Sequence, residues 1–180
     1  MAKIVLAAGA SVAIYKACDL ASKLAQAGHS VRAVLTPRAA QLVNPQLFEA
    51  VTGEPASVDE FGPARRGAMD HIELAKWAEL LLVAPASAGL IARLAHGQAD
   101  DLASTLALAL PANRPRLLAP AMNPTMLDAR PVQRNLALLR EDGWLVLEPA
   151  VGHTACGDDG KGRLPEPAEL VAAVARALRL

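Results

Sequence analysis

The 180-residue sequence has few cysteines, no net charge and no long apolar run. Its two cysteines are too few for a disulfide framework or a zinc site. The 18 basic and 18 acidic residues cancel, so no charge excess points to nucleic acid or to an acidic membrane. No apolar run reaches the ~18 residues of a membrane span, and the first run stops at Gly9 instead of forming a secretory signal. We therefore expect a cytoplasmic protein without nucleic-acid or membrane partners and without a bound metal.

Aromatic residues are also scarce, at 3%, although 53% of all residues are apolar and only 20% are charged. This length fits one domain with a substantial core, which we predict to span residues 1–180. The apolar excess indicates that part of the surface is covered in a subunit interface. The irregular stretch 37–67 is a candidate for such a contact.

Short apolar runs alternate with helical patterns along the chain. Strands are predicted near 3–8, 31–36, 79–84, 117–119 and 144–147, and helices at 12–27, 46–51, from 70 onward, 87–95, 101–110, 131–142 and 168–178. Residues 149–165 contain four glycines and no periodicity, so they are predicted to form a loop. This order predicts an α/β fold of three layers, Rossmann-like and more narrowly flavodoxin-like, in which helices cover both faces of a parallel sheet.

The turn after the first predicted strand lacks the dinucleotide-binding fingerprint. Gly9-Ala10-Ser11 has no second or third glycine, and no acidic residue ends the second strand. What remains is a helix start with a hydroxyl and free amides, which suits a phosphate or the edge of a flavin. Ser11 as a simple helix cap is the alternative. Arg38 could instead contact a 2′-phosphate, which is the one hint of NADP.

The stretch 117–126 places Asn123 just after a buried strand, in a turn held between Pro120 and Pro124. Ligands of open parallel sheets bind at the carboxyl ends of the strands. An amide offers two donors and an acceptor, so Asn123 can orient a carboxylate or a ring edge. The alternative is that Asn123 only caps a helix.

His71 follows Asp70 and precedes Glu73, two acids with the spacing of a capping box. That spacing places His71 in the first turn of a helix, where the dipole favours the neutral imidazole that a general base requires. A simply exposed histidine is the alternative. The pair Asp100-Asp101 is predicted to cap a helix and not to hold a metal.

Several motifs together resemble one family over almost the entire chain, the homo-oligomeric flavin-containing cysteine decarboxylases. The matching segments are 11–16, Thr36, 70–72, 84–88, 97–102, 120–123 with Met126, and 155–158 with Gly160, Gly162 and Arg163. Each motif is weak alone, whereas their order and spacing are specific.

The resemblance implies an FMN bound between the subunits of a homotrimer or of a higher assembly of trimers. The residues implied to contact the cofactor are Gly9, Ala10, Ser11, Val12, Thr36, Ser87, Ala88, Ala121 and Met122. The residues implied to contact the substrate are Asn123, Met126, Thr154, Ala155 and Lys161. The implied catalytic roles are a base for His71, a carboxylate ligand for Asn123, and a proton donor on a flap for Cys156.

The implied chemistry explains these residue types. Oxidation of the thiol carbon to a thioaldehyde, with hydride passing to FMN, puts a C=S group beta to the carboxylate, and carbon dioxide can then leave. The implied substrate is 4′-phosphopantothenoylcysteine of coenzyme A synthesis, and the alternative is the C-terminal cysteine of a peptide. Departures from the family pattern at Gly89, Leu127 and Leu164 leave this choice open.

Overall fold

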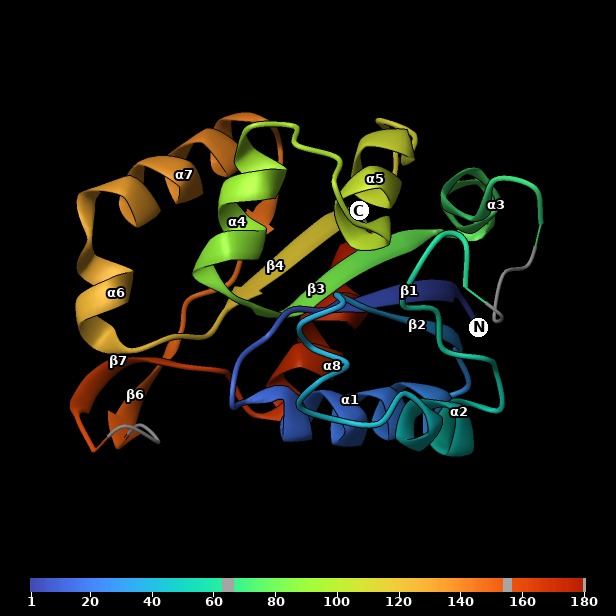
Figure 1. The fold of residues 1–180 in the computed structure, drawn as a ribbon. Coiled ribbons are helices and arrows are strands. Elements are labelled where there is room, and N and C mark those ends of the chain that lie inside the picture. Colours follow the sequence, from blue (N-terminus) through green and yellow to red (C-terminus); the bar gives the residue numbers. More distant parts are fainter. Residues whose placement is uncertain (63–66, 154–156, 180) are drawn as a thin grey trace.

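The structure, a computed structural model, describes residues 1–62, 67–153 and 157–179 and contains a five-stranded parallel sheet (Figure 1). The strand order is β2-β1-β3-β4-β5. The strands are β1 (Lys3–Ala8), β2 (Ser30–Leu35), β3 (Leu80–Ala86), β4 (Arg116–Pro120) and β5 (Leu145–Val146). This is the flavodoxin-like order, so the predicted fold class is confirmed.

The central strand β3 explains why the apolar runs are so continuous. All seven of its residues are buried, because helices cover both of its faces. Leu82 lies in register with Leu6 on one side and with Leu117 on the other. Such a row of aliphatic side chains is the pattern expected for the centre of a parallel sheet.

Two helical layers enclose the sheet (Figure 1). One layer contains α1 (Ile14–Gln26), α2 (Gln46–Thr52) and α8 (Pro167–Ala177), which pack on the face that includes Ile4, Leu6 and Leu82. The other contains α3 (Asp70–Trp77), α4 (Ala88–Ala95), α5 (Leu102–Ala109) and α7 (Arg130–Glu141) on the opposite face. No helix among the described residues is long and apolar enough to cross a membrane.

The stretch 149–165 is not the loop that the sequence predicted. It contains β6 (Ala150–His153) and β7 (Asp159–Arg163), which pair antiparallel as a separate two-stranded sheet. Glycines at 152, 160 and 162 interrupt the alternation of apolar and polar side chains that identifies a strand, so backbone pairing alone defines this hairpin. The short helix α6 (Pro124–Asp128) is missing from the predicted helices, but it begins where the alternative interpretation of Asn123 as a helix cap requires one.

The predicted capping box at the start of α3 is wrong. Met69 occupies the cap position, and Asp70 is fully buried within the first turn. The Glu73 amide donates to the Met69 carbonyl, and among the described residues no side chain caps this end. The predicted cap at Asp101 is confirmed, because its carboxylate accepts a hydrogen bond from the Ser104 amide at 2.8 Å.

Close backbone contacts fasten the β6–β7 hairpin to the turn after β4. The Met122 amide donates to the Gly162 carbonyl at 3.0 Å. A Cβ atom at Gly162 would overlap the Met122 carbonyl oxygen, and one at Gly160 would lie 3.0 Å from Pro124 Cγ. Glycine at these two positions is therefore the condition for the hairpin to lie along the Asn123 turn.

We predict that Gly162→Ala separates the hairpin from this turn and destabilises the protein by ~3 kcal/mol, from overlap and backbone strain combined. Gly53→Ala is the matched control, since Gly53 has a positive φ of 72° but no atoms within 4 Å of an added Cβ. The control is expected to cost only ~1 kcal/mol. Equal losses of unfolding free energy for both variants in urea would contradict the close-contact argument.

Candidate functional site

A cavity of about 720 Å³ lies at the carboxyl ends of β1, β3 and β4, the edge at which ligands bind in open parallel sheets. Its walls come from the turns that follow these strands, the loop after β2, and the hairpin. The residues that line it are Ala10, Ser11, Val12, Ala13, Tyr15, Lys16, Arg38, Gln41, Leu42, Ser87, Ala88, Ala121, Met122, Asn123, Met126, His153, Gly162, Arg163 and Leu164.

The turn after β1 offers a row of hydrogen-bond donors. Within the described residues, the backbone N–H groups of Ala10, Ser11 and Val12 donate no hydrogen bond. The Ser11 hydroxyl is 3.4 Å from the Ala13 amide, so it lies at the geometric limit of a local cap. Gly9 allows this turn to approach its neighbour, because a Cβ there would lie 2.9 Å from the Pro85 carbonyl oxygen.

The turns after β3 and β4 form the adjoining wall. Ser87 occupies the cap position of α4, yet its side chain makes no capping hydrogen bond with that helix. Next to it lie Ala88, Ala121 and Met122, whose small or apolar side chains border the cavity. The Ala121 amide donates to the Ala86 carbonyl at 3.1 Å, which joins the two turns.

Asn123 uses both ends of its side-chain amide. Its Oδ1 atom accepts from the Thr125 amide at 2.8 Å and from the Met126 amide at 3.4 Å, which caps α6. Its Nδ2 atom donates to Asp158 Oδ2 at 2.5 Å. The two readings of Asn123, a helix cap and a carboxylate ligand, are therefore compatible in one side chain.

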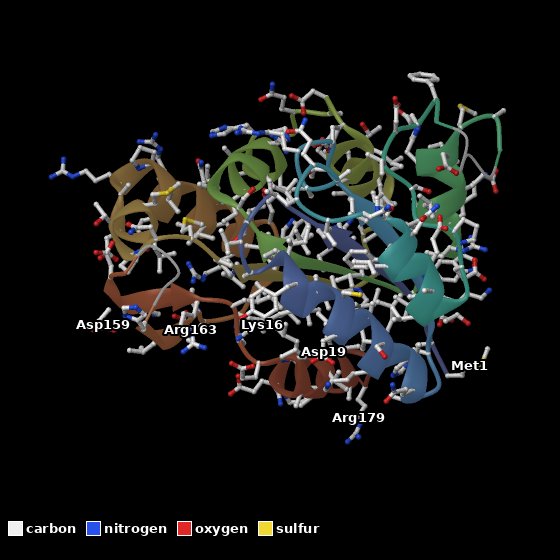
Figure 2. The ribbon with its side chains drawn as sticks, turned by 60° about the horizontal axis from the view of Figure 1, so that its bottom comes forward. Met1, Lys16, Asp19, Asp159, Arg163 and Arg179 are labelled. Atoms are coloured by element: carbon white, nitrogen blue, oxygen red, sulfur yellow. The ribbon has the colours of Figure 1, made fainter. Side chains whose placement is uncertain are left out.

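Two basic residues that border the cavity, Lys16 and Arg163, come from α1 and β7. Lys16 is almost buried, and its Nζ atom donates to Glu166 Oε1 at 2.6 Å. Arg163 Nη2 lies 3.6 Å from the same oxygen, and Figure 2 shows Arg163 beside Lys16 with Asp159 further out on the hairpin. The hydrogen bond from Lys16, with the charges of Lys16 and Arg163, lowers the pKa of the Glu166 carboxyl below its ordinary value.

Some residues predicted for the site do not line the cavity. Gly9 lies behind the first turn, and Thr36 is buried with its hydroxyl accepting from the Ala39 amide at 3.2 Å. Lys161 donates to Glu148 on the surface. Thr154, Ala155 and Cys156 lie outside the described residues, so the proton donor predicted at Cys156 stays a prediction.

His71 also lies elsewhere within this chain. It is the second residue of α3, which lies on the side of the molecule opposite α6 and the hairpin (Figure 1). Its Nδ1 atom contacts Glu60 Oε1, and both side chains are about one-fifth exposed. One copy of the chain thus does not place His71 in the cavity that contains Asn123.

The sequence reasoning missed several residues of the cavity. Gln41 and Leu42 come from the irregular loop after β2, and His153 comes from the hairpin that was predicted as a loop. Arg38 was noted only as a possible phosphate contact. The rule that strand ends share one edge would have pointed to the loop after β2, but not to the hairpin, which belongs to no strand of the main sheet.

The chain belongs to the flavoprotein family, because the profile of that family matches residues 1–179. The resemblance identified from the sequence motifs is therefore confirmed at the level of the family. The fold and the position of the cavity agree with it.

Comparison with curated proteins gives a more specific similarity than the family profile. The chain is 46% identical over 170 residues to the coenzyme A biosynthesis bifunctional protein CoaBC of Vibrio cholerae, and 44% identical over 169 residues to that of Escherichia coli K12. These matches cover 94% of this chain but only 42% and 41% of the two relatives. The chain thus spans less than half the length of the curated relatives that it matches.

Solved structures share the whole fold. A cysteine-to-serine mutant of PPC decarboxylase complexed with pantothenoylaminoethenethiol is 28% identical, with a TM-score of 0.87 and 99% of both chains covered. The FMN-dependent cysteine decarboxylase SpaF is 30% identical, with a TM-score of 0.83 and 99% of this chain and 96% of the other covered. The FMN-binding protein AtHal3 is 29% identical, with a TM-score of 0.82, and 97% and 95% covered.

The donors and walls of the cavity fit a flavin. A flat ring system needs an apolar slot, which Val12, Ala88, Ala121 and Met122 provide. A phosphate needs amide donors, and the N–H groups of residues 10–12 are available within the described residues. The volume of about 720 Å³ lies in the range of ligand pockets.

We predict that Glu166→Gln lowers the free energy of unfolding at pH 7 by roughly 1 kcal/mol, because it leaves the nearly buried Lys16 without its carboxylate partner. The folded-state pKa of Glu166 is depressed, so its contribution is present above the ordinary value of 4.5 and disappears as pH falls through the lower folded value. Denaturant titrations of the wild type and of Glu166→Gln from pH 7 to pH 3 measure whether their unfolding free energies converge. Glu148→Gln is the control, expected to cost less because both Glu148 and Lys161 are more than half exposed. A gap that does not narrow as the pH falls below 4.5 would show that the pair acts through packing.

Proposed function

We propose that this protein is a cytoplasmic flavoenzyme that binds FMN and decarboxylates 4′-phosphopantothenoylcysteine to 4′-phosphopantetheine. The relatives named for coenzyme A biosynthesis and the PPC decarboxylase with the same fold support this assignment. The motifs around Ser11, Ser87, Asn123 and Asp158 support it independently, since they lie in or beside one cavity.

The observation that carries the proposal is the contact of Asn123 with a carboxylate. Its Nδ2 atom donates to the Asp158 carboxylate, while capping of α6 fixes the orientation of its Oδ1 atom. A substrate carboxylate that reaches this turn would meet the same donor beside the flavin slot. An uncharged amide holds a carboxylate in place without the strong ground-state stabilisation that a cation would add.

Bound FMN would supply the hydride acceptor that cysteine decarboxylation requires. The ring would lie against the three strand-end turns, with Ser11, Ser87 and the amides of residues 10–12 as its polar contacts. His71 would take the proton from the substrate thiol, and Asn123 and Met126 would orient the carboxyl end. Arg38 and Arg163 at the rim provide cations for the phosphates.

We also propose that a second copy of the chain completes the site, in a homotrimer or an assembly of trimers. His71 and Asn123 do not share a cavity in one copy. Apolar side chains are exposed both at the cavity mouth (Val12, Tyr15 and Leu42) and near the helix of His71 (Phe61 and Met69). An interface that joins these two surfaces would bury both groups and bring His71 to the neighbouring cavity.

The substrate assignment is tested with purified protein, FMN and 4′-phosphopantothenoylcysteine. We expect a flavin spectrum, release of carbon dioxide, and a saturated thiol as the product by mass spectrometry. A peptide ending in cysteine is the comparison substrate, because structural neighbours include proteins named simply as FMN-dependent cysteine decarboxylases. A product that is two hydrogens lighter, or a preference for the peptide, would favour oxidative decarboxylation of peptides. A protein that does not bind FMN would overturn the proposal.

The shared site is tested by mixing two defective variants. His71→Asn alone and Asn123→Ala alone are each expected to lose ~10² to 10⁴-fold in turnover. Co-expressed and co-purified through two tags, they are expected to regain roughly a quarter to a third of wild-type turnover. A mixed trimer has two intact partners at one of its three interfaces, and in larger assemblies the share approaches about a quarter. Wild-type assemblies with the same two tags are the control. Mixed assemblies as inactive as the single variants would place both residues in one subunit's site.

A further inference from the structure

Glu60 is the described side chain that contacts His71, and neither the sequence motifs nor the cavity pointed to it. Its Oε1 atom contacts the Nδ1 atom of the imidazole, across eleven residues of sequence. Within the described residues the Nε2 atom takes part in no hydrogen bond. In the part of the chain that the structure describes, the ring is thus held at Nδ1 and available at Nε2.

The backbone around Glu60 holds this geometry. Asp59 Oδ1 accepts from the Phe61 amide at 3.0 Å, and the Asp59 carbonyl accepts from the Gly62 amide at 3.1 Å. These two bonds close a tight turn with Glu60 at its second position. The side chains of Glu60 and His71 are each about one-fifth exposed, so water screens the contact only in part.

We propose that Glu60 is a positioning residue that fixes the tautomer of His71. A carboxylate accepts only, so its contact with Nδ1 requires the proton on Nδ1 and leaves the lone pair on Nε2. Nε2 is then the atom that takes the substrate's thiol proton. When Nε2 gains that proton, the imidazolium has its counter-charge already in place at Nδ1, as in the carboxylate–histidine pairs of other enzymes.

This inference rests on the proposed role of His71 as the base. It adds the claim that Glu60 decides which nitrogen of the imidazole carries the proton. Without Glu60 the imidazole of a neutral histidine can carry its proton on either nitrogen and can rotate. Turnover would then fall while the affinity for substrate stays the same, because Glu60 contacts the Nδ1 side of the imidazole whereas the substrate meets Nε2.

The test compares Glu60→Ala and Glu60→Gln with Glu73→Gln in the FMN-loaded protein. Glu73 is an exposed acid two residues after His71, a spacing that points it away from the imidazole. We expect kcat to fall about 10- to 100-fold in Glu60→Ala with KM unchanged. Glu60→Gln is expected to fall less, because its amide oxygen can still accept from Nδ1–H. The Glu73→Gln control is expected to keep wild-type turnover.

The tautomer itself is measured by nitrogen NMR of protein labelled in its four histidine side chains, with His71→Asn identifying the signal. We expect the wild-type ring to carry its proton on Nδ1 and the Glu60→Ala ring to lose that preference. An unchanged tautomer in Glu60→Ala would overturn the proposal whatever the turnover shows. A changed tautomer with wild-type turnover would also overturn it. If His71→Asn itself keeps full turnover, the base assignment fails instead, and the two failures are thereby distinguished.

Discussion

Hydrogen bonds between successive strand-end turns are the constraint on which the candidate site depends. The Gly9 amide donates to the Pro85 carbonyl at 2.8 Å, which joins the turn after β1 to the end of β3. The Ala121 amide then donates to Ala86, and the Met122 amide to Gly162. This series links three turns and the hairpin into one wall. Because each bond requires close backbone approach, at least one residue of each pair is glycine or alanine.

The same turn explains how Asn123 both caps a helix and donates to a carboxylate. Its side chain caps a five-residue helix that would have little stability alone. Capping fixes the amide plane, so the Nδ2 atom points toward the hairpin, where it meets Asp158. A donor that is immobilised by the fold loses little entropy when it binds a ligand carboxylate, which is an advantage of building a site on rigid elements.

The flavin slot and the histidine lie on different parts of the chain. The slot belongs to the carboxyl ends of the strands, whereas the Glu60–His71 pair belongs to the loop and helix before β3. Under the proposed assembly, catalysis depends on subunit contact as well as on folding. The exposed Phe61, Met69, Val12 and Tyr15 would then contribute both to association and to the enclosure of the site.

Much of this architecture was predictable from the chain alone. The alternation of apolar runs and helical periods gave the parallel sheet, since a strand buried on both faces must be apolar throughout. Ser11, Ser87 and Asn123 could be selected because each follows a predicted strand, and the ends of parallel strands meet at one edge. The family followed from the order of the motifs.

Other features were decided only by the tertiary structure. The β6–β7 hairpin has no side-chain alternation, so its pairing and its place along the Asn123 turn depend on contacts of Gly160 and Gly162 with residues some 40 positions earlier. Asp70 resembled a helix cap because its spacing to Glu73 is local, but the fold buries it inside the first turn. The contact of Glu60 with His71, eleven residues away, and the separation of His71 from Asn123 both depend on the tertiary fold, and local sequence patterns carry no information about such distances.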